Sequence, residues 1–185
     1  SSQLDEMEFY EETREGFITP TLSRETIRRN LSNLTLLAQE FVEEGFLEPM
    51  RTNIQTFHEK FSFATNHPVF ILSTGRAGTA AMHNFFNETK NLQSYHTFSC
   101  NVAPCDRNHI LYRIITGALD RQAIRIIYVN YLRARTAEFL FAYRQGNIPV
   151  IVNHWDTVFA PVNAIVFPGS RFIYLKRDSN AVATS

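Results

Sequence analysis

A glycine-containing loop links a short apolar segment to a helix-forming one in the middle of the chain. Residues 72–79 read Leu-Ser-Thr-Gly-Arg-Ala-Gly-Thr. Glycines allow several backbone N–H groups to converge on one anion, and the following helix adds the positive end of its dipole. Arg76 would add a cation with parallel donors, and Thr79 a hydroxyl. The loop therefore predicts a phosphate-binding site, with an ordinary tight turn between strand and helix as the alternative.

A second candidate phosphate contact lies near the end of the sequence. Arg177 closes a strand-like run, and Ser185 follows eight positions later. A guanidinium at a strand end and a hydroxyl about two turns into the next helix can hold one phosphate from two sides. Taken alone, the same residues also suit a capped helix with a surface ion pair.

A histidine follows another strand-like run. His154 comes directly after residues 149–153, which read Pro-Val-Ile-Val-Asn. A residue just beyond the carboxyl end of a parallel strand lies where α/β sheets bind ligands, and an imidazole suits a general base. Asp156 or Asn153 would orient its ring, and a histidine bonded only to backbone is the alternative. The weaker base candidates are His83, expected to be structural, His96 and His109.

Together these segments resemble the sulfotransferase family, whose donor is PAPS (3′-phosphoadenosine 5′-phosphosulfate). Residues 72–79 are similar to its 5′-phosphosulfate loop, and residues 172–185 to its 3′-phosphate motif, an Arg followed eight positions later by a Ser. The 23 residues from His154 to Arg177 are close to the family's spacing. The resemblance implies His154 as the base and Arg76 as a second catalytic residue. It implies that PAPS contacts Gly75, Arg76, Ala77, Gly78, Thr79, Ala80, Arg177 and Ser185.

The chain also departs from the family's pattern. Ala80 stands where a second Thr is frequent, and Ala81 where a Trp often stacks on adenine. Val152 stands two residues before His154, where cytosolic members carry a Lys. An Arg at position 76 resembles the loop of carbohydrate-type and bacterial members. The position of His154 resembles that of the catalytic His in cytosolic members. The sequence therefore leaves the acceptor open: a hydroxyl or amine of a carbohydrate, lipid or small molecule.

Two other functions stay open. A P-loop kinase or NTPase is disfavoured because no Gly-Lys-Ser/Thr follows the loop at the required spacing. A non-catalytic nucleotide-binding domain with the same fold is the other alternative. Family members usually continue well past the Ser of the 3′-phosphate motif, so we expect the sequence to be truncated at its C-terminal end.

The elements that must position these residues are those of an α/β fold. Strands are expected at residues 69–73, 149–153 and 171–175, and helices at 23–45, 49–63, 80–86, 110–119, 122–144 and from 179 onward. Residues 91–109 give no clear pattern. Alternating strands and helices favour a P-loop-type parallel sheet flanked by helices, with an N-terminal helical extension. We expect residues 1–67 to form that extension and residues 68–185 the PAPS-binding core.

Composition and charge favour a globular protein with an anionic ligand. Hydrophobic residues make up 44% and charged residues 19% of the chain. Residues 1–68 carry 12 acidic and 6 basic residues, whereas residues 69–185 carry 6 acidic and 12 basic residues. Basic residues that only solvate one face of the protein are the alternative. The apolar runs are too short to span a bilayer, and the acidic start does not resemble a signal peptide. We therefore expect a cytoplasmic protein whose partner is a small molecule or glycan rather than nucleic acid; a sequence that starts after a removed targeting segment is the alternative.

Metal chemistry is not expected. Cys100 and Cys105 lie five positions apart, and no second Cys/His pair stands at a suitable spacing for a metal site. The two residues suit either a disulfide or two free thiols.

Overall fold

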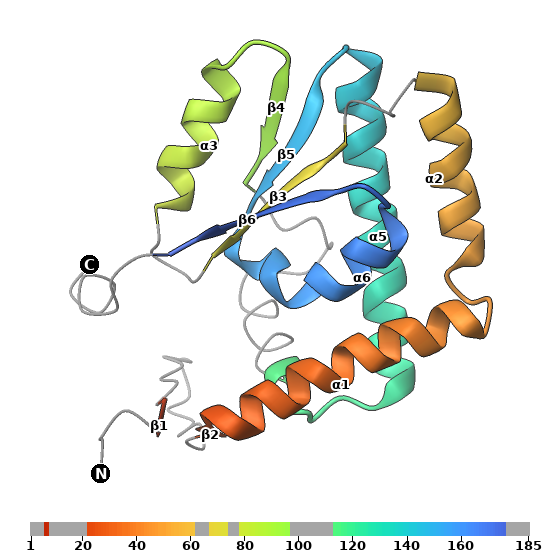
Figure 1. Ribbon diagram of the computed structural model, residues 1–185, viewed down its shortest axis with the longest axis vertical. Helices are drawn as coiled ribbons and strands as arrows, with labels where there is room; N and C mark the ends of the chain where they lie inside the picture. Colours follow the sequence, from red (N-terminus) through yellow and green to blue (C-terminus); the bar gives the residue numbers. More distant parts are fainter. Residues whose placement is uncertain (1–5, 8–21, 62–66, 74–77, 97–112, 177–185) are drawn as a thin grey trace.

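A four-stranded, all-parallel sheet with the spatial order β4-β5-β3-β6 forms the centre of the protein (Figure 1). The computed structural model describes residues 6–7, 22–61, 67–73, 78–96 and 113–176. The sheet strands are β3 (Val69–Ser73), β4 (Leu92–Tyr95), β5 (Ile148–Val152) and β6 (Arg171–Leu175). Two short strands, β1 (Glu6–Met7) and β2 (Leu22–Ser23), pair antiparallel. The α/β class and the parallel sheet that the sequence predicts are confirmed.

All three predicted strands are present, and the fourth was missed. β3 and β5 are the inner strands, which is why they are continuous apolar runs. β4 lies in the segment without a clear pattern, because only its pairing with β5 identifies it as a strand. β6 is an edge strand, and its aromatic and aliphatic side chains are largely exposed: Phe172, Ile173 and Tyr174.

The helices follow the predicted order closely. They are α1 (Arg24–Glu43), α2 (Glu48–Phe61), α3 (Thr79–Glu88), α5 (Arg121–Arg144) and α6 (Ala160–Val166), with a 3₁₀ helix η1 (His154–Phe159). Ser23 caps α1 as predicted, because its Oγ accepts a hydrogen bond from the Thr26 N–H at 3.1 Å. The helix predicted at 110–119 is wrong at its end: residues 113–115 are helical, and Gly117 leaves the helix with φ of +71°.

Helices cover both faces of the sheet, and α3 and α5 lie on opposite sides of it in Figure 1. Ile71, Val150 and Val152 face α3, where Met82 and Phe86 pack against them. The alternate residues of the same strands face a larger apolar cluster that α1, α5, η1 and α6 supply. This cluster includes Leu34, Phe41, Phe70, Tyr128, Leu132, Phe139, Ile151, Phe159 and Val166.

The two N-terminal helices contribute to the same core as the sheet. Leu34, Ala38 and Phe41 of α1, and Leu47 before α2, are at most 3% exposed. They belong to the apolar cluster that contains Phe70 of β3. The division of the chain after residue 67 into an extension and a core domain stays a prediction.

Candidate functional site

The carboxyl ends of the parallel strands meet at one edge of the sheet. β3 ends at Ser73, which pairs with Leu175 of β6. β5 pairs with the opposite side of β3, and its last residue is Val152. His154 follows Val152 by two residues. The three segments that the sequence singles out therefore extend from three neighbouring strands, in the order β5-β3-β6.

The connections of two of these strands diverge. β3 leads to α3, which packs on one face of the sheet, whereas β5 leads to η1 and α6, which pack on the other. Neighbouring strands with connections on opposite faces form a topological switch point, and α/β sheets bind ligands outside the carboxyl ends at such a point. The end of β3, the start of α3 and His154 all lie there.

The described part of the predicted phosphate loop forms the start of α3. Gly78 precedes the helix with φ of +90°, a conformation that suits glycine. It provides no side-chain cap, and the first turn contains no acidic residue. Thr79 is buried and Ala80 is exposed. The Ser73 hydroxyl, on a residue 2% exposed, has no hydrogen-bond partner among the described residues. Among the described residues, no side-chain cap and no acidic residue of the first turn compensates the positive end of this helix dipole.

A threonine connects the middle of η1 to the end of β3. The Thr157 hydroxyl accepts a hydrogen bond from the Ser73 N–H at 3.1 Å and donates to the Ser73 carbonyl at 2.9 Å. Asn153 caps η1, since its Oδ1 accepts from the Trp155 N–H at 3.1 Å. The segment carrying His154 is thus fixed at both its start and its middle.

His154 is partly buried, and its ring lies against Trp155, with 4.4 Å between ring centroids. Burial lowers the pKa of His154 below its ordinary value, and the charge of His96 lowers this pKa further. The negative charge of Asp156 raises the pKa, but by less. The ring makes no hydrogen bond to another described side chain. A neutral histidine whose ring nitrogens bond no described side chain can accept a proton.

The expectation that Asp156 or Asn153 orients this ring is not met, because Asp156 is the centre of a buried network. Arg135 of α5 donates to it through Nε (2.9 Å to Oδ1) and Nη2 (2.6 Å to Oδ2), and both side chains are at most 1% exposed. Tyr131 also donates to Asp156 and accepts from Asn163 at 2.7 Å. The network anchors η1 to α5, and so positions His154 indirectly.

His96 follows β4, beside the end of β5. Its Nδ1 lies 2.5 Å from the carbonyl oxygen of Val152, and its ring stacks on that of His83, with 5.4 Å between centroids. Tyr95 anchors the strand end by donating to the backbone carbonyl of Glu138 at 2.8 Å. His96 is a weaker candidate from the sequence because residues 92–95 show no strand pattern. The signal that could have found it is the one that found His154, a histidine directly after a strand.

His83 is held neutral by its neighbours on α3 and β4. The Ser94 N–H donates to Asn87 Oδ1 at 2.9 Å, which leaves the Asn87 amide nitrogen facing His83 Nε2 at 3.2 Å. Because that nitrogen only donates, Nε2 must be unprotonated, and Nδ1 donates to Ser94 Oγ at 2.9 Å. Burial and, second, the charge of His96 lower the pKa of His83. These contacts hold the His83 ring between α3 and β4, and its structural role stays a prediction.

The remaining predicted site residues lie outside the described part of the chain. These are Gly75, Arg76, Ala77, Arg177 and Ser185, together with Cys100, Cys105 and His109. Their roles stay predictions.

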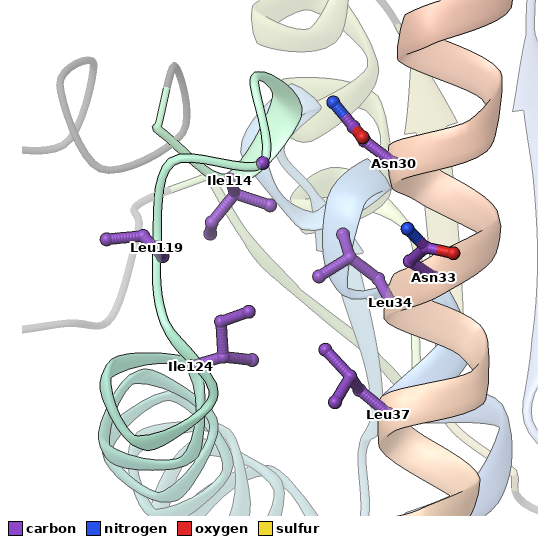
Figure 2. A pocket seen from close by; sticks show the side chains of 8 residues that line it. Asn30, Asn33, Leu34, Leu37, Ile114, Leu119 and Ile124 are labelled. Atoms are coloured by element: carbon purple, nitrogen blue, oxygen red, sulfur yellow. The ribbon is translucent and has the colours of Figure 1, made fainter.

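A separate small pocket lies between α1 and the segment before α5. Figure 2 shows Leu34 and Leu37 of α1 facing Ile114 and Ile124 across it. Its volume is about 120 Å³, well below the roughly 300 Å³ at which ligand pockets begin. None of the candidate site residues lines it, so we assign it no part in the site.

Comparisons of the chain with models of protein families, with curated proteins and with solved structures find no match. Within the described ranges, no three His, Cys, Asp or Glu side chains are grouped so that they could hold a metal ion. In the same ranges, no helix has the length and apolar character needed to cross a membrane.

Proposed function

We propose that the chain is the nucleotide-binding part of a sulfotransferase, which moves a sulfuryl group from PAPS to an acceptor hydroxyl or amine. The observation that carries the proposal is strand adjacency. The two segments that resemble phosphate motifs are far apart in the sequence, yet they follow β3 and β6, which pair along their whole length. A donor with a phosphate at each end of its ribose would meet both segments if it lay across these two strand ends.

The described residues suit the 5′-phosphosulfate end of this donor. The start of α3 offers an uncapped helix dipole and no acidic side chain. The buried Ser73 hydroxyl, which lacks a partner among the described residues, lies at the start of the same loop. Arg76, from the sequence, would add the cation that such a loop needs. The net charge of +6 over residues 69–185, from 12 basic and 6 acidic residues, acts in the same direction.

In the proposed reaction, the acceptor oxygen or nitrogen attacks sulfur in line with the bridging oxygen. A bond from the acceptor to sulfur forms, the bond from sulfur to the bridging oxygen breaks, and PAP (3′-phosphoadenosine 5′-phosphate) leaves with the bonding electrons. The acceptor's proton passes to the neutral imidazole of His154. Arg76 and the N–H groups at the start of α3 stabilise the negative charge that develops on the leaving phosphate.

Calorimetric titration with PAP, beside ADP and with and without magnesium, tests the binding part of the proposal. Wild type should bind PAP without magnesium and more tightly than ADP. Arg177→Ala should weaken PAP binding roughly 10- to 100-fold, the value of a charge-assisted hydrogen bond. Arg171→Ala is the matched control, because this exposed arginine lies at the opposite end of β6. It should leave PAP affinity unchanged.

The other outcomes separate the alternatives. Magnesium-dependent binding of ADP, with no preference for PAP, would support a kinase or NTPase. Absence of PAP binding in wild type would contradict the proposal. It would favour the alternative of a non-catalytic domain with the same fold.

Turnover tests the role of His154. PAP release from PAPS is followed with sugar, phenol and amine acceptors in wild type and His154→Ala. Loss of a general base should reduce turnover by about 10²- to 10⁴-fold while PAP affinity is kept. Retained turnover in the variant would remove His154 from this role.

A further inference from the structure

The carboxyl edge of the sheet is divided into two halves. β3 and β6 lead into the two segments with phosphate-binding character, whereas β4 and β5 lead to His96 and His154. If the donor lies over the β3 and β6 ends, the acceptor must approach sulfur from the side of β4 and β5. Two histidines occupy that side.

The hydrogen bonds of His96 determine where its proton lies. The Val152 carbonyl can only accept, so the Nδ1 of His96, 2.5 Å away, carries the proton. The neutral ring therefore has its lone pair on Nε2, which has no partner among the described residues. Val152 is the residue that ends β5, two positions before His154. The hydrogen bond thus joins His96 to the backbone that carries His154.

His96 is also held from the α3 side. Its ring stacks on His83 at an interplanar angle of 25°, and the hydrogen bonds of His83 to Asn87 and Ser94 fix that ring in place. His83 accepts from Asn87 at Nε2, so it stays neutral while that hydrogen bond holds. The described charged groups that act on His154 are His96 from β4 and Asp156 from η1.

We propose that His96 is a positioning residue for His154, and that a positive charge on His96 disfavours protonation of His154. This inference rests on the proposed function, because it treats His154 as the base. The hydrogen bond to Val152 fixes the backbone before the base, and a charge on His96 repels a second proton from His154. The base therefore stays unprotonated, and competent, at more acid pH than it would alone.

The test is an NMR titration of the imidazole Cε1–H signals of the whole chain between about pH 5 and pH 8, where histidines change charge. The signal of His154 is assigned by its loss in His154→Gln. The informative variant is His96→Asn, whose amide can still donate to Val152 in place of Nδ1 but cannot become charged. Urea unfolding of the same variant shows whether the fold is kept.

In His96→Asn, the titration midpoint of His154 should rise, because the repelling charge has gone. The acid limb of PAP release from PAPS should move to higher pH by the same amount, while PAP affinity is unchanged. His96→Ala, which also loses the Val152 hydrogen bond, should in addition lower turnover at the alkaline plateau.

A His154 midpoint that does not move in His96→Asn would overturn the inference and leave the proposed function intact, provided that wild type binds PAP. An equal plateau in His96→Ala and His96→Asn would overturn the positioning role of the hydrogen bond. If wild type does not bind PAP, the proposed function fails, and the inference about its base falls with it.

Discussion

Removing the charge of Asp156 should destabilise the protein strongly, since it would leave a buried arginine without its main partner. Arg135 has a fully buried side chain and makes two hydrogen bonds to this carboxylate. In Asp156→Asn, the new amide nitrogen would face either the arginine or Tyr131, which also donates to this position. Breaking a buried pair by removing one partner costs about 3–5 kcal/mol. Because Arg135 keeps its ion pair with Glu138, we expect a loss of free energy of unfolding near the lower limit of this range.

A loss of about 3 kcal/mol is large beside the roughly 5–15 kcal/mol that stabilises a native domain. For a chain of this size it corresponds to a fall in Tm of roughly 6–12 °C. The assay is urea unfolding, followed by far-UV circular dichroism and by the fluorescence of Trp155. Trp155 is the single tryptophan and the neighbour of Asp156, so its signal reports on η1 directly. Coincident transitions from the two probes would justify a two-state treatment.

Two controls make the result interpretable. Glu48→Gln removes an exposed ion pair with Arg51 and should leave the midpoint unchanged. The double variant Arg135→Met with Asp156→Leu should be less destabilised than Asp156→Asn, because the fully buried guanidinium is no longer left without its carboxylate partner. A loss below about 1 kcal/mol in Asp156→Asn would refute the reasoning, since a pair that costs so little to break is worth no more than a surface one.

Three further predictions follow from single contacts. Gly169→Ala should lose more stability than Gly146→Ala. Both glycines have positive φ, which costs about 1–2 kcal/mol for other residues. Only at Gly169 would the new Cβ also lie 2.4 Å from an atom of the His67 ring. Equal unfolding midpoints for the two variants would contradict this. Thr157→Val should cost about 1–3 kcal/mol in urea unfolding, because the end of β3 loses two hydrogen bonds, whereas Thr157→Ser should retain most of the stability. The lowered pKa of His154 predicts that kcat/KM falls only below the ordinary histidine range near pH 6.5, since the base acts unprotonated; an acid limb above that range would argue against His154 as the base.

The strands and helices that stand out in the sequence do so for local reasons. Residues 69–72 and 149–152 are continuous apolar runs because β3 and β5 are covered on both faces. Ser23 could be identified as the start of α1 because a cap is a contact between residues three apart. The four residues of β4 carry no such local pattern, and η1 and α6 are too short to show a period.

By itself, the sequence determined the fold class, three of the four sheet strands, the main helices and the histidine at the end of β5, because each depends on neighbours a few positions away. Tertiary structure alone decided that β6 pairs with β3, that Arg135 on a helix is buried against Asp156, and that His96 lies beside the end of β5. These are contacts between residues far apart in the chain, and burial fixes them only once the sheet and its two helical layers have assembled.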